Sequence, residues 1–250
     1  MNANRRSSAV GWAIAVTLAG WGAMAIAGWP SRRAIPTPRA MMATAWNELS
    51  STRIWRDVGA TGVRVIAGVV VAAILGGVLG LALGAGRTRW RAAQPVVDFL
   101  RSVPPILTFP WFLLALGFGE ASRFATVVFG TTGIVLLHVG VALDRTPEAR
   151  RDAARWMGLR GWAAFRHALL PEALPGWLTG VQVAISAGLV IAVVTEMLIG
   201  ARDGLGARAL EAQIEYRADV LWLVMVLAGT LGMGLSSAVA WAGRRFAPWT

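Results

Sequence analysis

The sequence predicts an all-α membrane protein with six transmembrane helices. Of its 250 residues, 56% are hydrophobic and only 15% are charged, and the mean hydropathy is +0.58. Soluble domains carry roughly 25% charged residues, so this composition does not fit a soluble globular enzyme. Six apolar runs are long enough for helices to cross a bilayer core of about 30 Å. We therefore predict one transmembrane domain over 1–250.

The six predicted spans are distributed along the whole chain. The first, 9–29, has no charged residue and is longer than the apolar core of a cleaved signal peptide, which remains the alternative for this segment. The third contains Pro104, Pro105 and Pro110, which leave backbone groups unpaired and predict a kink packed against protein. The remaining spans are predicted at about 58–86, 95–119 (the kinked third span), 124–143, 176–200 and 220–243.

The distribution of arginine predicts the orientation of these spans. All 24 basic residues are arginine; thirteen lie in the segments on the side of the two termini and nine on the opposite side. Basic loops stay in the cytoplasm, so we expect both termini to be cytoplasmic. The first external loop is an exception, because it carries five of the nine arginines.

Missing residue types exclude several reaction classes. The chain has no lysine, which a Walker A loop needs to reach nucleotide phosphates and a Schiff base needs as its amine. It has no cysteine and only two histidines, which argues against thiolate catalysis and a zinc site. We expect no catalytic residue, metal, cofactor or nucleic-acid partner for this chain.

The connection over 144–175 is much longer than two membrane helices require. Pro147 marks a helix start, and Gly158 and Gly161 mark a sharp break. A second short helix, 162–170, is predicted to end at Pro171. The residues alone leave two interpretations open: an ordered helix–turn–helix on the cytoplasmic face, or an amphipathic hairpin lying on lipid headgroups.

The same connection resembles the EAA loop of ABC importer permeases. Asp152-Ala153-Ala154 is followed after three residues by Gly158 and after nine more by Ala168-Leu169-Leu170-Pro171. In that family the pattern begins with glutamate and ends in Ile-x-Leu-Pro, so Asp152 and Ala168 depart from it. Five further segments are similar to segments of nitrate, sulfonate and taurine permeases: Ile35–Pro38, Phe99–Pro105, Leu116–Gly119, Thr195–Met197 and Gly204–Gly206.

The resemblance implies a type I ABC importer permease (MetI-like) fold with a cytoplasmic coupling helix. It implies transport by alternating access of a small solute such as a sulfonate, taurine or nitrate. The implied partners are a second permease copy in a homodimer, two ATPase subunits that bind ATP and Mg²⁺, and an external solute-binding protein. The implied coupling residues are Arg150, Asp152, Ala153, Ala154, Arg155, Trp156, Met157, Gly158, Leu159, Arg160 and Pro171.

Four ionisable residues lie within or beside predicted spans: Arg64, Asp98, Arg101 and Glu196. Charges in the membrane are costly, so each must be paired or face water. Asp98 and Arg101 share a helix face and form either a local ion pair or a cationic lining for an anionic substrate. Arg64 is expected to snorkel, and Glu196 either pairs with an arginine of another span or lines the pathway.

An ion-gradient-driven secondary transporter is the alternative function. It would use Asp98, Glu196 or His138 as the ion-binding group, and it predicts transport without an ATPase. Repeats with broken helices at corresponding positions, which are typical of such carriers, are not recognisable in the sequence.

Overall fold

A computed structural model describes residues 12, 15–17, 19–24, 27, 34–159, 161–198 and 200–246. Every regular element within these residues is a helix, which confirms the predicted fold class. The first predicted span, 9–29, lies for the most part outside the described residues and stays a prediction.

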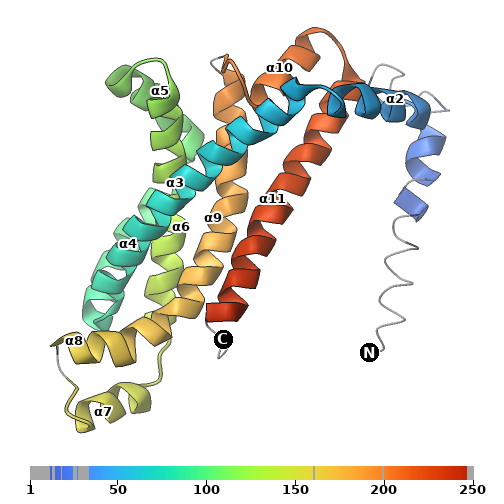
Figure 1. Ribbon diagram of the computed structural model, residues 1–250. Coiled ribbons are helices and arrows are strands. Elements are labelled where there is room, and N and C mark those ends of the chain that lie inside the picture. Colours follow the sequence, from blue (N-terminus) through green and yellow to red (C-terminus); the bar gives the residue numbers. More distant parts are fainter. Residues whose placement is uncertain are drawn as a thin grey trace.

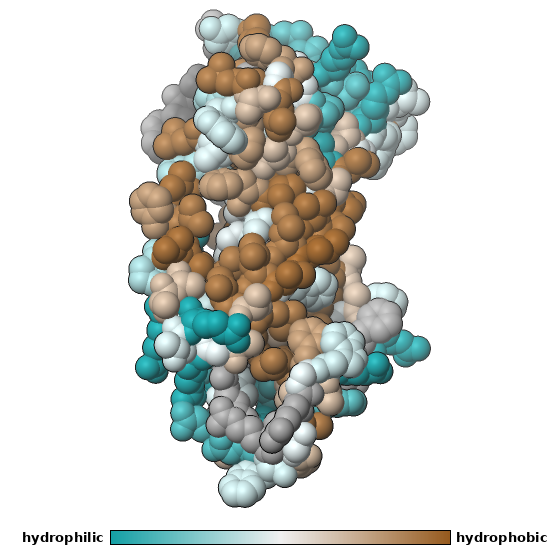
Figure 2. Space-filling view, turned by 90° about the vertical axis from the view of Figure 1, so that its left-hand side faces the viewer, coloured by the Kyte–Doolittle hydropathy of each residue, from teal (hydrophilic) through white to brown (hydrophobic). Residues whose placement is uncertain are grey.

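Four described helices are long and apolar enough to cross a bilayer, and the bent pair α4 and α5 adds a fifth span if it is counted as one. Three of the four are α3 (Thr52–Gly84), α6 (Glu120–Asp144) and α11 (Ala218–Phe246). The fourth runs without interruption over Gly161–Leu198 and contains α9 (Leu170–Leu198). Figure 2 shows apolar side chains across the middle of the molecule and hydrophilic ones at both ends, as a bilayer requires.

The third predicted span is broken, as its prolines predict. α4 (Arg87–Ser102) and α5 (Pro105–Leu116) meet at an angle of 81°. Proline lacks the backbone donor of a helix interior and restricts the preceding residue to extended backbone. Val103 accordingly has ψ of 118°, and α5 begins with Pro105 at its first position.

Small residues let α3 and α6 approach closely. A Cβ added to Gly76 would lie 2.7 Å from the Thr132 carbonyl oxygen, and one added to Gly80 would lie 2.7 Å from the Val139 Cβ. The ring of Trp90 on α4 lies against Gly140, where an added Cβ would come within 2.0 Å of it. Glycine spacing on one face of α3 therefore serves helix packing, the usual role of small residues in membrane helices.

The predicted end of a short helix at Pro171 is wrong. α8 (Gly161–Ala164) passes through the π-helical turn η1 (Phe165–Leu169) directly into α9. In η1 the Leu170 N–H donates to the Phe165 carbonyl, five residues back. This wider turn relieves the contact that a proline ring makes with the preceding helical turn, so the helix continues through Pro171.

Two further helices were not predicted. α2 (Pro38–Leu49) starts at Thr37, whose hydroxyl accepts a hydrogen bond from the Ala40 N–H, and α10 (Leu205–Ile214) follows Gly204. Figure 1 places α2 and α10 at one end of the bundle, and α7 (Glu148–Trp156), α8 and the end of α11 at the other. The two ends carry the two candidate functional regions.

Candidate functional site

The predicted coupling loop forms a hairpin that projects from the bundle around α7 (Figure 1). The Pro147 carbonyl accepts a hydrogen bond from the Arg150 N–H at 3.1 Å, and Glu148 stands in the first turn, where a carboxylate is favourable. Gly158 and Gly161 have φ of 71° and 54°, values that favour glycine. The sequence therefore builds a short helix followed by a sharp reversal.

Large apolar side chains face solvent at the tip of this hairpin. Trp156 is 89% exposed and Met157 is 70% exposed. Trp162 is also exposed and stacks on Phe165 with ring centroids 5.0 Å apart. Aromatic and methionine side chains left exposed together are typical of surfaces that bind a partner.

Two ion pairs fasten the hairpin to membrane helices. Glu148 pairs with Arg87 at the start of α4, and Arg150 pairs with Glu172 of α9. A cavity of about 170 Å³ lies between α7 and the η1–α9 segment. Its lining includes Arg150, Ala153, Met157, Leu159, His167, Pro171 and Glu172.

The structure places most of the predicted coupling residues on this hairpin. Asp152 is partly buried and Gly158 is exposed on the turn. The side chains of Ala154 and Arg155 are not described, and Arg160 lies outside the described residues. Arg150 was predicted as a partner contact, and it also fastens α7 to α9.

At the opposite end of the bundle, Arg64 joins three helices. Its Nη1 donates to Oε1 of Glu196 on α9 at 2.6 Å, and its Nε and Nη2 donate to Glu120 of α6 at 2.6 and 2.9 Å. Glu120 also accepts from Arg123 at 3.1 Å. Arg64 therefore forms two ion pairs, and the prediction that it snorkels to water is wrong. Glu196 pairs with an arginine of another helix, which is one of the two roles predicted for it.

Glu196 is fully buried and accepts hydrogen bonds from two further donors. The Thr61 hydroxyl lies 2.9 Å from Oε1, and the Gly206 N–H donates to Oε2 at 2.8 Å. A Cβ at Gly206 would lie 2.1 Å from the Val193 carbonyl oxygen, so only glycine brings this N–H so close. The Thr195–Met197 and Gly204–Gly206 segments, separate in sequence, thus form one site.

Glu120, Arg123 and Thr61 were missed as members of this network. Glu120 and Arg123 are three residues apart at the start of α6, a spacing that predicts a pair on one helix face. The contact of Glu120 with Arg64 depends on how α3 packs beside α6, which no local pattern in the sequence encodes.

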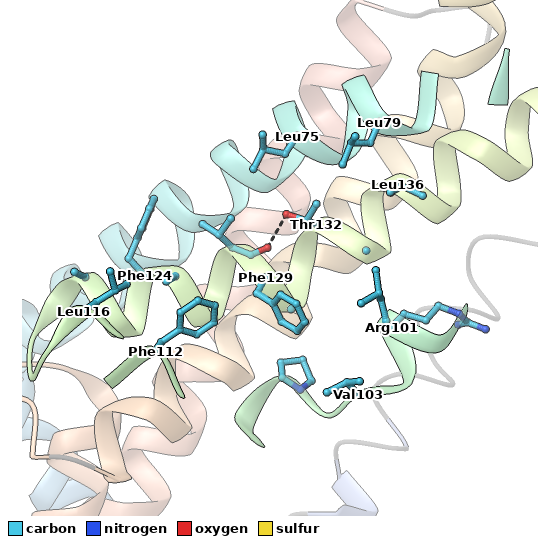
Figure 3. Close-up of a pocket in the computed structure, with 17 residues that line it drawn as sticks. Leu75, Leu79, Arg101, Val103, Phe112, Leu116, Phe124, Phe129, Thr132 and Leu136 are labelled. Atoms are coloured by element: carbon cyan, nitrogen blue, oxygen red, sulfur yellow. Dashed lines mark hydrogen bonds between the residues drawn. The ribbon is translucent and has the colours of Figure 1, made fainter. Parts of the chain in front are cut away.

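Asp98 and Arg101 form the predicted local ion pair, with Arg101 Nε 2.9 Å from Asp98 Oδ1. Both side chains remain about half exposed. Arg101 stands at the edge of an apolar cavity of about 650 Å³ between α3, α5 and α6. Figure 3 shows its guanidinium pointing away from the apolar side chains of that cavity, which include Leu79, Phe112 and Phe129.

Three protein relatives resemble the chain over most of its length. A probable ABC transporter permease of Brucella melitensis is 27% identical over 238 residues, covering 94% of each chain. The putative aliphatic sulfonates transport permease SsuC of Escherichia coli is 28% identical over 85% of this chain and 80% of its own. The nitrate import permease NrtB of Synechocystis is 27% identical over 71% of this chain and 64% of its own.

Solved structures support the same fold. The MetNI methionine ABC transporter in an inward-facing conformation matches with a TM-score of 0.60 and 25% identity over 76% of this chain and 95% of the matched chain. An amino acid ABC transporter in a crystal structure with histidines matches with a TM-score of 0.59 and 15% identity over 82% and 97%. The latter likeness concerns the fold alone.

A family model described as the binding-protein-dependent transport system inner membrane component matches residues 49–250, which include every described helix from α3 to α11. This match covers well over half of the sequence. It agrees with the helical architecture and with the several helices that are apolar enough to cross a membrane. The chain belongs to this family and is an ABC importer permease subunit.

Proposed function

We propose that this permease forms a homodimeric pathway that moves a small solute by alternating access, with energy received from two separate ATPase subunits at the α7 hairpin. The observation that carries this proposal is the hairpin itself. It is an exposed helix with apolar side chains at its tip, and two ion pairs hold it to α4 and α9. A projecting helix fixed in this way transmits a push to the spans rather than yielding to it.

The composition supports a division of labour between chains. Without a lysine, the chain has no residue for the phosphate-binding role of a Walker A loop. ATP and Mg²⁺ are therefore assigned to the partner ATPases. An external solute-binding protein delivers the cargo, as the family description implies.

The arginine distribution and the fold together support one orientation in the membrane. The α7 hairpin and the end of α11 lie at the same end of the bundle (Figure 1), and the hairpin and the residues near it are rich in arginine. Basic segments are retained in the cytoplasm, so we assign this end and both termini to the cytoplasmic side of a bacterial inner membrane.

We assign the cargo to small anionic solutes of the sulfonate and nitrate class. The support is the resemblance to permeases whose names specify aliphatic sulfonates and nitrate. Carriage by an ion gradient fits less well, because its candidate groups are engaged. Glu196 and Asp98 are ion-paired, and His138 Nδ1 contacts the Ile134 carbonyl at 2.8 Å.

The test uses Gly158, where an added Cβ would meet no described atom within 4 Å. Gly158→Arg should abolish ATP-dependent uptake and co-purification of the ATPase, because its bulk would occupy the contact. Gly158→Asn is the matched control, since asparagine tolerates the left-handed backbone, and it should retain most uptake. Equal uptake by both variants and the wild type would refute the docking role of the hairpin.

A further inference from the structure

α2 has its polar side chains turned toward the protein and its apolar side chains turned away. The Thr44 hydroxyl donates to Asp219, and Arg208 donates to both oxygens of Glu48 at 2.7 and 2.6 Å. On the outer side of the helix, Met42 is 75% exposed and Trp46 is 77% exposed. A helix in contact with water has the opposite arrangement.

The exposed apolar residues form a narrow stripe. The stripe consists of Met42, Trp46 and Leu49, which are exposed and follow the spacing of one face of an α-helix. Arg39 is exposed on the same face. Asn47 is also exposed, but five residues along a helix place it about 140° around the axis from Met42. One flank of α2 is therefore apolar and the other polar, which is the pattern of a helix lying in a membrane interface.

The stripe is continuous with the apolar surface of α3. Trp55 lies beside the end of α2, because its indole N–H donates to the Leu49 carbonyl at 3.0 Å, and its ring is exposed. Ile66 stands eleven residues further along α3, on the same helix face, and is exposed. Tryptophan at the end of an apolar helix face marks the level of lipid headgroups.

Arginines accompany the stripe. Arg39 and Arg56 are exposed and form no ion pair within the described part of the chain, whereas the nearby Arg53 pairs with Glu211 at 2.6 Å. Unpaired arginines at an aromatic belt match the phosphates of anionic lipids. They also account for the excess of arginine in the first external loop, which the retention of basic loops in the cytoplasm does not explain.

We propose that α2 lies flat in the headgroup layer of the outer leaflet, with Met42, Trp46 and Trp55 inserted among the acyl chains and Arg39 and Arg56 bound to anionic phospholipids. The choice of leaflet rests on the proposed orientation, and the lipid contact itself does not. This inference goes beyond the transport function and holds for a permease of any cargo.

The absence of cysteine from the chain makes single-cysteine labelling direct. Met42→Cys and the control Asn47→Cys are each coupled to an environment-sensitive nitrobenzoxadiazole dye, and the full chain is placed in nanodiscs of phosphatidylcholine and phosphatidylglycerol. Nitroxide-labelled lipid should quench the dye at position 42 more strongly than at position 47, and aqueous iodide should do the reverse. Strong iodide quenching at position 42 would contradict the proposal. So would a dye at position 42 that neither agent quenches, because a second copy or another protein would then cover it.

The proposed binding of anionic lipid by Arg39 and Arg56 is measured separately in the same nanodiscs. Native mass spectrometry counts phosphatidylglycerol retained by Arg39→Gln, Arg56→Gln and the control Arg202→Gln, an exposed arginine of the α9–α10 connection. Retention should fall about fivefold for each of the first two variants, the factor expected for one basic residue at an anionic surface, and stay unchanged in the control. Equal retention by all three variants would overturn the assignment of Arg39 and Arg56.

Discussion

Arg64 and Glu196 form an ion pair inside the bundle, with 2.6 Å between Nη1 and Oε1, and the glutamate is inaccessible to solvent. The pair joins α3 to the end of α9, and the Asp203 carbonyl also accepts from Nη1 at 2.8 Å. The arginine therefore fixes both the end of α9 and the connection that follows it.

Removing the arginine should leave a buried charge without its cationic partner. Arg64→Gln is expected to cost about 3–5 kcal/mol of stability, because a buried carboxylate cannot recover its hydration. The midpoint of thermal unfolding, followed by tryptophan fluorescence in one detergent, measures the loss. Glu120→Gln is the matched control: this partner is 61% exposed, so its removal should cost about 1 kcal/mol or less. Similar losses for both variants would contradict the assignment.

The contact between Trp90 and Gly140 predicts a sharp intolerance to one methyl group. Gly140→Ala would place a Cβ 2.0 Å from a ring that is 1% exposed and has no room to move. We expect a loss of about 1–3 kcal/mol from overpacking, measured by thermal unfolding. Gly234→Ala, where nothing lies within 4 Å, should leave stability unchanged or raise it by up to about 1 kcal/mol. A harmless Gly140→Ala would mean that α4 and α6 are further apart.

The lowered pKa of Glu211, which lies on α10 outside the membrane spans, predicts that the stability of the fold depends on pH. Burial alone would raise the pKa of its carboxyl, but hydrogen bonds from Arg208 at 2.8 Å and Arg53 at 2.6 Å outweigh burial and lower that pKa. A depressed folded-state pKa gives stability that is fully present above the ordinary value of about 4.3 and is lost as pH falls through the folded-state value. The wild type should therefore unfold at a higher temperature than Glu211→Gln near neutral pH, and the difference should vanish in acid. A difference that grows in acid would have the wrong sign.

The pairing of Arg150 with Glu172 predicts that ATP-driven uptake requires opposite charges at these two positions. Arg150→Glu should lower ATP-driven uptake, because it sets two carboxylates against each other and releases α7 from α9. Stability should change by only about 1 kcal/mol, since the arginine is largely exposed. The combined variant Arg150→Glu/Glu172→Arg restores the pair and should recover uptake. Failure of this rescue, with intact assembly, would indicate that Arg150 itself contacts the partner.

Much of the fold could be predicted because its signals are local. Long apolar runs correspond to α3, α6, α9 and α11, and Pro104 and Pro105 predict the bend between α4 and α5. The continuation of the helix through Pro171 was not predictable in the same way. It depends on the π-helical turn over 165–169, and that geometry has no signature in residue types.

The candidate site was likewise predictable only where its signals are local in sequence. The spacing from Asp152 to Pro171 locates the hairpin, and the three-residue separation of Asp98 and Arg101 predicts their pair. The ring of contacts around Glu196 draws on Thr61, Arg64 and Gly206, which lie far apart or on different helices. Only the packing of α3 against α9 brings these groups together.

The uninterrupted helix over Gly161–Leu198 gives the molecule a lever. Thirty-eight residues at about 1.5 Å each make a rod of about 57 Å. One end of the rod begins at the hairpin turn, and Glu196 stands near the other. Displacement of the hairpin must therefore tilt the whole rod or bend it at the π-helical turn, so torque applied on one side of the bilayer reaches the far side without crossing a loop.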